Sequence, residues 1–177
     1  MSRLLTDQDV LRALRRIAHE IIERNRGVDS VALVGIRTRG VHLAQMLSDV
    51  IEQFEGKAVP LGELDVTAHR DDLDETTRPG TIDTVIPFDL EGKSVVLVDD
   101  VLYTGRTVRA ALDAISEIGR ADKIELAVLI DRGHRELPVR ADYVGKNIPT
   151  SNDERVSVHV PQVDGDIGVW LHNGALV

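Results

Sequence analysis

The fold of this chain is decided by the stretch Val95-Val96-Leu97-Val98-Asp99-Asp100-Val101-Leu102-Tyr103-Thr104-Gly105-Arg106-Thr107. Its first four residues are valine or leucine, which is typical of a strand buried on both faces of a parallel sheet, and we expect the strand to end at the two acids. The turn with Thr104 and Gly105 leads into apolar residues at helical spacing, which continue as far as Gly119. The stretch therefore predicts a strand, a short turn and a helix.

This unit predicts a binding site for a phosphorylated sugar. The first turn of a helix has backbone N–H groups without partners inside the helix, and such groups bind phosphate. Ionised Asp99 and Asp100 only accept hydrogen bonds, so they suit the hydroxyl groups of a sugar beside the phosphate. The backbone N–H groups and the two acids together predict a binding site for a phosphoribosyl group. The alternative is an ordinary junction between a strand and a helix, in which the acids only cap the helix or face solvent.

Length and composition are those of a globular chain with a single domain over residues 1–177. Hydrophobic residues make up 42% and charged residues 29%, and the absence of cysteine excludes disulfides and thiolate sites. No apolar run is long enough to span a membrane, and we expect a cytoplasmic protein. The net charge of −9 arises largely between Glu63 and Glu91, where nine acidic residues stand against two arginines. This acidity argues against nonspecific coating of nucleic acid and leaves a local basic surface possible.

Apolar periodicity predicts strands that alternate with helices, which is typical of an α/β parallel sheet with right-handed crossovers. Ligands bind to such sheets beyond the carboxyl ends of the strands. We therefore expect the polar turns 37–40, 99–107 and 131–135 to meet at one edge. The full prediction is a helix from Thr6 to Gly27, a strand 31–36, a helix 41–51 stopped by Gly56, a strand 59–66, a flexible loop at about 67–86, a strand 124–130, and short extended pieces at 142–144, 156–160 and 167–171.

The turn Arg37-Thr38-Arg39-Gly40 follows a buried strand and opens a helix. Two guanidinium groups together with backbone N–H groups suit a highly charged anion such as pyrophosphate. The alternative is a pair of solvated arginines in a loop. The proximity of this turn to the 99–107 turn in the expected sheet favours the anion site.

The 95–107 stretch resembles the signature of the type I phosphoribosyltransferases, which bind phosphoribosyl pyrophosphate (PRPP). The resemblance implies the fold of that family: a twisted, mainly parallel sheet flanked by helices, with a small hood of short strands built from the N- and C-terminal segments. It also implies a nitrogen base that displaces pyrophosphate from PRPP, with Mg²⁺ bound mainly through PRPP and no dedicated metal site on the protein. Asp99 and Asp100 would orient the ribose, Thr38 and Arg39 would contact pyrophosphate, and Arg70 would swing onto it from the loop. The expected substrate-binding residues of the signature are completed by Val101, Leu102, Tyr103, Thr104, Gly105, Arg106 and Thr107.

Three further segments, 16–25, 64–73 and 131–150, resemble the PyrR family of bifunctional pyrimidine-operon regulators and uracil phosphoribosyltransferases. This resemblance implies that the protein makes UMP from uracil and PRPP, with uracil over Arg132 and near Val156. It also implies binding of an mRNA leader hairpin of a pyrimidine operon, with UMP or UTP as co-effector, by a homodimer or higher homo-oligomer. The matching RNA-binding positions are Arg16, His19, Arg135, Arg140 and Lys146.

The first helix supports an RNA surface independently, because Arg12, Arg16 and His19 share its polar face. The alternative is an ordinary solvated face of an amphipathic helix. Two further functions stay open: a type I phosphoribosyltransferase for another base without RNA regulation, and an RNA regulator with only vestigial catalysis. Arg15 stands where the family resemblance implies a small polar residue, which would alter local RNA contacts. The sequence leaves open whether control acts on transcription or on translation.

Overall fold

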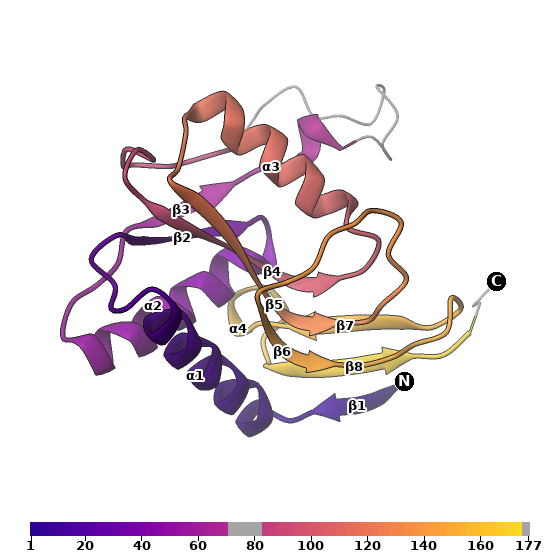
Figure 1. Ribbon diagram of the computed structural model, residues 1–177. Helices are drawn as coiled ribbons and strands as arrows, with labels where there is room; N and C mark the ends of the chain where they lie inside the picture. Colours follow the sequence, from indigo (N-terminus) through magenta and orange to yellow (C-terminus); the bar gives the residue numbers. More distant parts are fainter. Residues whose placement is uncertain (71–82, 175–177) are drawn as a thin grey trace.

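The computed structural model describes residues 1–70 and 83–174, and a five-stranded parallel sheet runs through its centre (Figure 1). Every neighbouring pair of strands in this sheet is parallel, which confirms the predicted α/β class. The strands that the sequence marks as wholly apolar are the buried central ones, because both faces of the sheet are covered. In sheet order they are β3 (Leu61–Leu64), β2 (Val31–Ile36), β4 (Ser94–Leu102), β5 (Lys123–Asp131) and β6 (Tyr143–Asn147).

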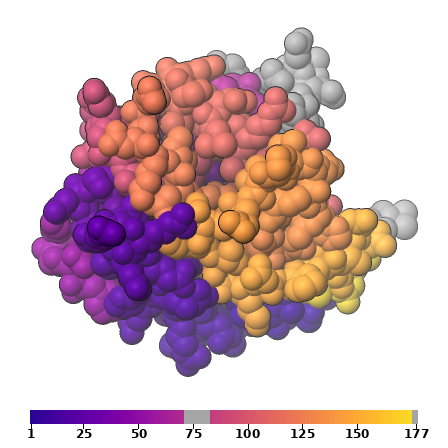
Figure 2. All heavy atoms as spheres, viewed as in Figure 1, coloured from indigo at the N-terminus to yellow at the C-terminus, as the bar shows by residue number. Residues whose placement is uncertain are grey.

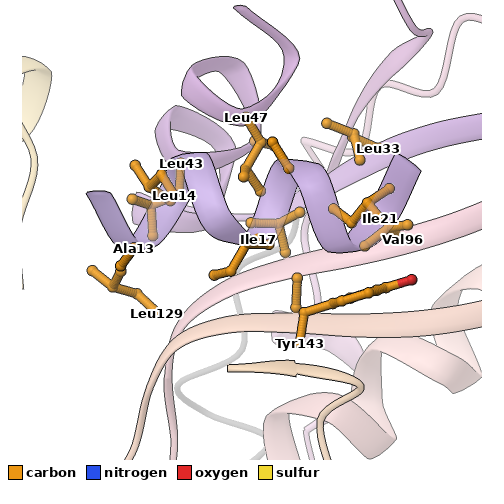
Figure 3. Packing of buried hydrophobic residues seen from close by; sticks show 14 of the residues in the cluster. Ala13, Leu14, Ile17, Ile21, Leu33, Leu43, Leu47, Val96, Leu129 and Tyr143 are labelled. Carbon is orange, nitrogen blue, oxygen red and sulfur yellow. The ribbon is translucent and has the colours of Figure 1, made fainter. Parts of the chain in front are cut away.

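Helices cover both faces of the sheet. The helices α1 (Asp7–Arg24) and α2 (Arg39–Glu55) lie on one face, and α3 (Arg106–Ile118) lies on the other (Figure 1). A capping box starts α1, since Thr6 and Asp9 each accept a hydrogen bond from the other's backbone N–H. Figure 3 shows Leu14, Ile17 and Ile21 of α1 in one apolar cluster with Leu47 of α2 and Leu129 of β5.

A second, antiparallel sheet is built from the two ends of the chain in the order β1 (Ser2–Leu5), β8 (Gly168–His172) and β7 (Arg155–His159). The short helix α4 (Pro161–Asp164) connects β7 to β8. We call these four elements the hood. The hood confirms the predicted small layer of short strands from the N- and C-terminal segments.

The predicted end of β4 at the two acids is wrong. The strand continues to Leu102, because Val101 and Leu102 pair in parallel with Ile130 and Asp131 of β5. The strand β3 is also shorter than the predicted 59–66. Of the predicted flexible loop 67–86, residues 71–82 lie outside the described residues; before them, residues 67–69 form one turn of 3-10 helix.

Candidate active site

The carboxyl ends of β2, β4 and β5 lie at one edge of the sheet, and the three predicted polar turns leave from this edge. The turn after β4 opens into a cavity of about 380 Å³, which we call the phosphate-turn cavity. It is lined by Asp99, by residues 101–108, by Arg70 and by Glu136. The structure thus brings the signature residues and the loop arginine to one place, apart from Asp100.

The phosphate turn itself needs glycine at position 105. Gly105 has a φ of 94°, and a side chain there would bring its Cβ to 3.3 Å from Val139. The hydroxyl of Thr104 accepts a hydrogen bond from the backbone N–H of Arg106 at 3.3 Å. Because α3 begins at Arg106, the first backbone N–H groups of this helix lie at the cavity, where a phosphate group would meet them.

The two acids differ sharply in environment. Asp99 is buried, and the loss of hydration together with the neighbouring Asp100 raises the pKa of the Asp99 carboxyl well above its usual range. Its Oδ1 accepts a hydrogen bond from the backbone N–H of Asp100 at 2.9 Å. Asp100 is only partly buried and lines a second cavity. The pair therefore faces both cavities, as expected of groups that hold a ligand spanning them.

The second cavity, of about 400 Å³, lies between the start of α2 and the hood, and we call it the hood cavity. Arg39, Asp100 and Val156 line it, together with Arg155, Ser157, Val158, His159 and His172. The peptide bond between Arg37 and Thr38 is cis, and Thr38 is exposed directly before Arg39. Arg39 forms a two-point ion pair with Asp164 of α4: its Nη2 lies 2.7 Å from Oδ1, and its Nε lies 3.1 Å from Oδ2. This bond raises the pKa of Arg39 and lowers the pKa of Asp164.

Arg132, the residue expected under uracil, is buried and does not line the same cavity as Val156. Its guanidinium lies 4.0 Å from the centre of the Tyr103 ring and donates hydrogen bonds to the backbone oxygens of Ser151 and Glu154. The arginine thus fixes the segment that leads into β7, while one face of its guanidinium is covered by Tyr103.

The segment 131–141 packs directly on the phosphate turn. The backbone N–H of Glu136 donates to the oxygen of Thr104 at 2.9 Å, and the Glu136 carboxylate pairs with Arg106 at 2.9 Å. Arg135 donates to the backbone oxygen of Tyr103 at 2.8 Å and to the carboxylate of Asp131 at 2.5 Å. The guanidinium of Arg135, expected on the RNA surface, is therefore engaged by acceptors of its own chain.

The other predicted RNA-binding residues lie on the outside of the molecule. Arg16 of α1 donates to the backbone oxygens of Val144 at 3.2 Å and Gly145 at 2.5 Å, the two residues before Lys146. Figure 2 shows the indigo N-terminal region beside the orange segment of β6 on one face. His19 lies against the ring of Phe54 on α2, with ring centres 4.1 Å apart, and Arg140 is exposed. The structure thus brings Arg16 against the backbone of β6, next to Lys146 in the sequence.

Sequence reasoning missed two acids: Glu136, which lines the phosphate-turn cavity, and Asp164, which pairs with Arg39. Each pairs with an arginine far away in the sequence, so no local pattern could have revealed the pairing. The one available signal for Asp164 is the sequence Pro161 to Gly165, since proline at the start and glycine after the end mark a short helix.

Two classes of feature are absent from the described residues. Within residues 1–70 and 83–174, no three His, Asp or Glu side chains come together in a group that could hold a metal ion. None of the helices in this part of the chain combines the length and the apolar character needed to cross a bilayer.

Comparison with known proteins agrees with this geometry. Residues 1–162 match the family model described as the phosphoribosyl transferase domain. The chain is 58% identical over 177 residues to the bifunctional protein PyrR of Thermus aquaticus, covering 98% of each chain. It is also 58% identical over 173 residues to the bifunctional protein PyrR of Bacillus cereus strain AH820, covering 96% of each.

Solved structures with the same fold include hypoxanthine phosphoribosyltransferases. That of Staphylococcus aureus has a TM-score of 0.71 at 20% identity, covering 94% of this chain and 89% of its own. That of Trypanosoma cruzi, a mutant in a ternary complex with substrates, has a TM-score of 0.72 at 19% identity, covering 94% of this chain and 92% of its own. These likenesses show the fold alone. The match over the family model and the identity over nearly the full length show more: the chain belongs to the phosphoribosyltransferase family and, within it, to the PyrR proteins.

Proposed function

We propose that the protein transfers the phosphoribosyl group of PRPP to uracil, giving UMP and pyrophosphate, and that it binds the leader RNA of a pyrimidine operon when a uridine nucleotide is bound. The observation that carries the first activity is the phosphate turn at the end of β4 beside Asp99 and Asp100. In the reaction a ring nitrogen of uracil forms a bond to C1 of the ribose, the bond from C1 to the pyrophosphate oxygen breaks, and the nitrogen releases its proton.

Each part of the site has a role that follows from its charge. Positive charge develops on the ribose ring as pyrophosphate leaves, and the carboxylate of Asp100 at the hood cavity opposes that charge. Asp99 orients the ribose hydroxyls from its buried position. The backbone N–H groups at residues 104–107 bind the 5′-phosphate, and Arg39 binds the leaving pyrophosphate.

Mg²⁺ suits the oxygen-rich chemistry of this place, because it prefers carboxylate and phosphate oxygens and keeps several waters. We expect PRPP to supply most of its ligands, with Asp100 the protein carboxylate nearest to them. When bound, the ion would neutralise charge on the pyrophosphate.

An assay with labelled uracil, PRPP and Mg²⁺ tests the transferase directly. The wild-type protein should form UMP, and Asp100→Asn should reduce kcat by about 100-fold because it removes charge stabilisation in the transition state. Asp113→Asn, which removes an exposed carboxylate of α3, should leave the rate unchanged. Turnover of hypoxanthine or orotate in place of uracil would reassign the base, and no turnover with any base would leave only the RNA regulator.

The RNA activity is supported by the surface that joins α1 to the segment 131–146. Arg16 binds the backbone of the two residues before Lys146 and also pairs with Glu20, while Lys146 is exposed and brings positive charge to this surface in a chain whose net charge is −9. Aromatic residues make up only 3% of the chain, so contacts to the phosphates and the shape of a folded hairpin are favoured over base stacking. The same segment contacts the turn after β4 through Glu136 and Arg135. A nucleotide bound at that turn would therefore affect the position of the RNA surface.

Gel-shift titrations with the leader RNA test this activity. We expect Lys146→Ala to weaken RNA binding and to reduce the slope of log affinity against log salt by about one, because one phosphate contact is lost. Lys57→Ala removes an equal charge two residues after the end of α2 and should leave both values unchanged. RNA binding that is indifferent to UMP, or to Arg140→Ala and Lys146→Ala together, would contradict the proposal.

The proposal extends to assembly and location. We expect a homodimer or higher homo-oligomer, in which the RNA surface is shared between subunits, and a cytoplasmic protein that meets both PRPP and mRNA. Sedimentation velocity with and without RNA tests the assembly, and a monomer that binds RNA fully would contradict it.

A further inference from the structure

Two arginines, Arg39 and Arg155, line the hood cavity, and the backbone of Arg39 is fixed by close packing. A Cβ on the next residue, Gly40, would lie 2.3 Å from the backbone oxygen of Val98 in β4. The start of α2 is therefore pressed against the strand that carries Asp99 and Asp100. The side chain of Arg39 is long, however, and a fixed backbone alone leaves its guanidinium free to adopt several rotamers.

Asp164 removes this freedom. Its two carboxylate oxygens accept hydrogen bonds from Nε and Nη2 of Arg39, and its Oδ2 also accepts one from the backbone N–H of Val160 at 2.9 Å. The Asp164 side chain is only 14% exposed, so water screens the pair weakly. Planar two-point pairing fixes both the position and the orientation of the guanidinium.

The pairing leaves Arg39 able to bind an anion. A guanidinium has five N–H donors, and two of them are directed to Asp164. The Nη1 group and the remaining Nη2 hydrogen are left for a ligand, and the Arg39 side chain is 35% exposed where it lines the hood cavity beside Asp100.

We propose that Asp164 is the positioning residue for Arg39, holding its guanidinium in the orientation that binds the pyrophosphate part of PRPP and of the product. This inference rests on the proposed function and adds to it a residue of the hood. Because α4 connects β7 to β8, the ion pair also links the hood to the turn 37–40 at the start of α2. A group held in place before the ligand arrives loses less entropy on binding.

Steady-state kinetics separate this role from a merely structural one. Asp164→Asn should raise the KM for PRPP and the inhibition constant for pyrophosphate by about tenfold, the usual effect of losing a residue that orients a ligand-binding group. The KM for uracil and the affinity for RNA should stay within twofold. Asp166→Asn, two residues further along and half exposed, is the matched control and should change neither constant.

A second variant keeps the test decisive if Asp164→Asn unfolds. Arg39→Lys leaves Asp164 in place and keeps the positive charge but cannot form the two-point pair, so it should raise the KM for PRPP and the inhibition constant for pyrophosphate by about tenfold and leave the KM for uracil within twofold. Where Asp164→Asn folds, adding it to Arg39→Lys should raise the KM for PRPP less than twofold further. Calorimetric titration of each folded variant with pyrophosphate alone gives the same comparison without turnover. Equal changes in the constants for uracil and PRPP, or additive effects of the two substitutions, would overturn the role of Asp164. A wild-type protein that neither forms UMP nor binds pyrophosphate would overturn the proposed function and this inference together.

Discussion

At the scale of single residues, Asp99 is a buried carboxyl group whose charged form is disfavoured by the fold. It is a carboxylate at the end of an apolar strand, buried beside a second carboxylate. Burial and Asp100 both disfavour its charged form, which is why its pKa is raised. Groups with strongly shifted pKa values gather at functional sites, and the position of Asp99 in the phosphate-turn cavity fits this pattern.

Asp99→Asn should therefore stabilise the protein while it weakens catalysis. The folded protein holds the Asp99 proton more tightly than the unfolded chain does, so the free energy of unfolding of the wild type falls as pH rises from about 4 through the raised pKa. Asparagine keeps the acceptor oxygen for the Asp100 N–H and has no charge to bury. Urea unfolding at a series of pH values should show the variant more stable by on the order of 1 kcal/mol at neutral pH. If the difference in the free energy of unfolding between Asp99→Asn and the wild type does not grow as pH rises above about 4, this explanation is contradicted.

Gly105→Ala should weaken UMP binding, because the left-handed conformation strains alanine and its Cβ would press on Val139. Gly56→Ala is the matched control: Gly56 has a φ of 74° with open space around it, at the end of α2. Both variants should lose about 1 kcal/mol of stability in urea unfolding. Only Gly105→Ala should lose affinity for UMP in calorimetric titration, and equal affinities would show that the turn does not bind the phosphate.

At the scale of elements, the segment 131–141 packs on the turn after β4 and contributes Glu136 to the lining of the phosphate-turn cavity. It begins at the carboxyl end of β5, next to β4, so the parallel sheet brings it to the turn. Its acid Glu136 lines the cavity where we expect a phosphate, which is negatively charged like the Glu136 carboxylate. The same carboxylate accepts a hydrogen bond from Arg106. A bound phosphate would compete with Glu136 for that arginine.

Glu136→Gln should raise the affinity for UMP by a few fold, since it removes a negative charge from the phosphate site. The ion pair is half exposed, so its loss should change stability little. The same variant should reduce the effect of UMP on RNA binding, because the segment no longer responds to the ligand. Calorimetry with UMP and gel shifts with and without UMP measure the two effects, with Asp113→Asn as control. Weaker UMP binding by the folded variant would show that Glu136 supports the site instead.

At the scale of the whole molecule, the hood joins the two ends of the chain over the sheet. Residues 2–5 supply β1, which pairs with β8, and β8 pairs with β7 at the hood cavity. Trp170 in β8 is the single tryptophan, and its ring lies 5.0 Å from the guanidinium carbon of Arg3. Its fluorescence therefore reports on the hood alone.

Deletion of residues 2–5 should shift the emission of Trp170 to longer wavelength and weaken catalysis at the hood cavity, because β8 loses its neighbour on one side. Arg3→Lys keeps the strand and should shift the emission much less. Inorganic phosphate should bind both variants as it binds the wild type, since the phosphate-turn cavity lies on the main sheet. Unchanged emission after the deletion would show that β1 does not support the hood.

The sequence predicted the main sheet, the three main helices and the family, because each depends on patterns within one short stretch. Its 95–107 run specifies strand, turn and helix locally, and three segments specify the PyrR family, which the 58% identity confirms. The end of β4 was predicted wrongly, since its last residues are held by pairing with β5 and not by their own composition. The roles of the site residues stay predictions.

What the sequence determined by itself is the strand, the turn and the helix of one run of thirteen residues, and with them the place where we expect a phosphate and a ribose to bind. Only the tertiary structure decided which side chains surround that place. It pairs Arg39 with Asp164, 125 residues away, and Arg106 with Glu136, 30 residues away. It also brings Arg16 into hydrogen bonds with the backbone just before Lys146. The physical reason is that an ion pair depends on where packing places two side chains, and charged residues on surface loops carry no periodic pattern that reveals their partners.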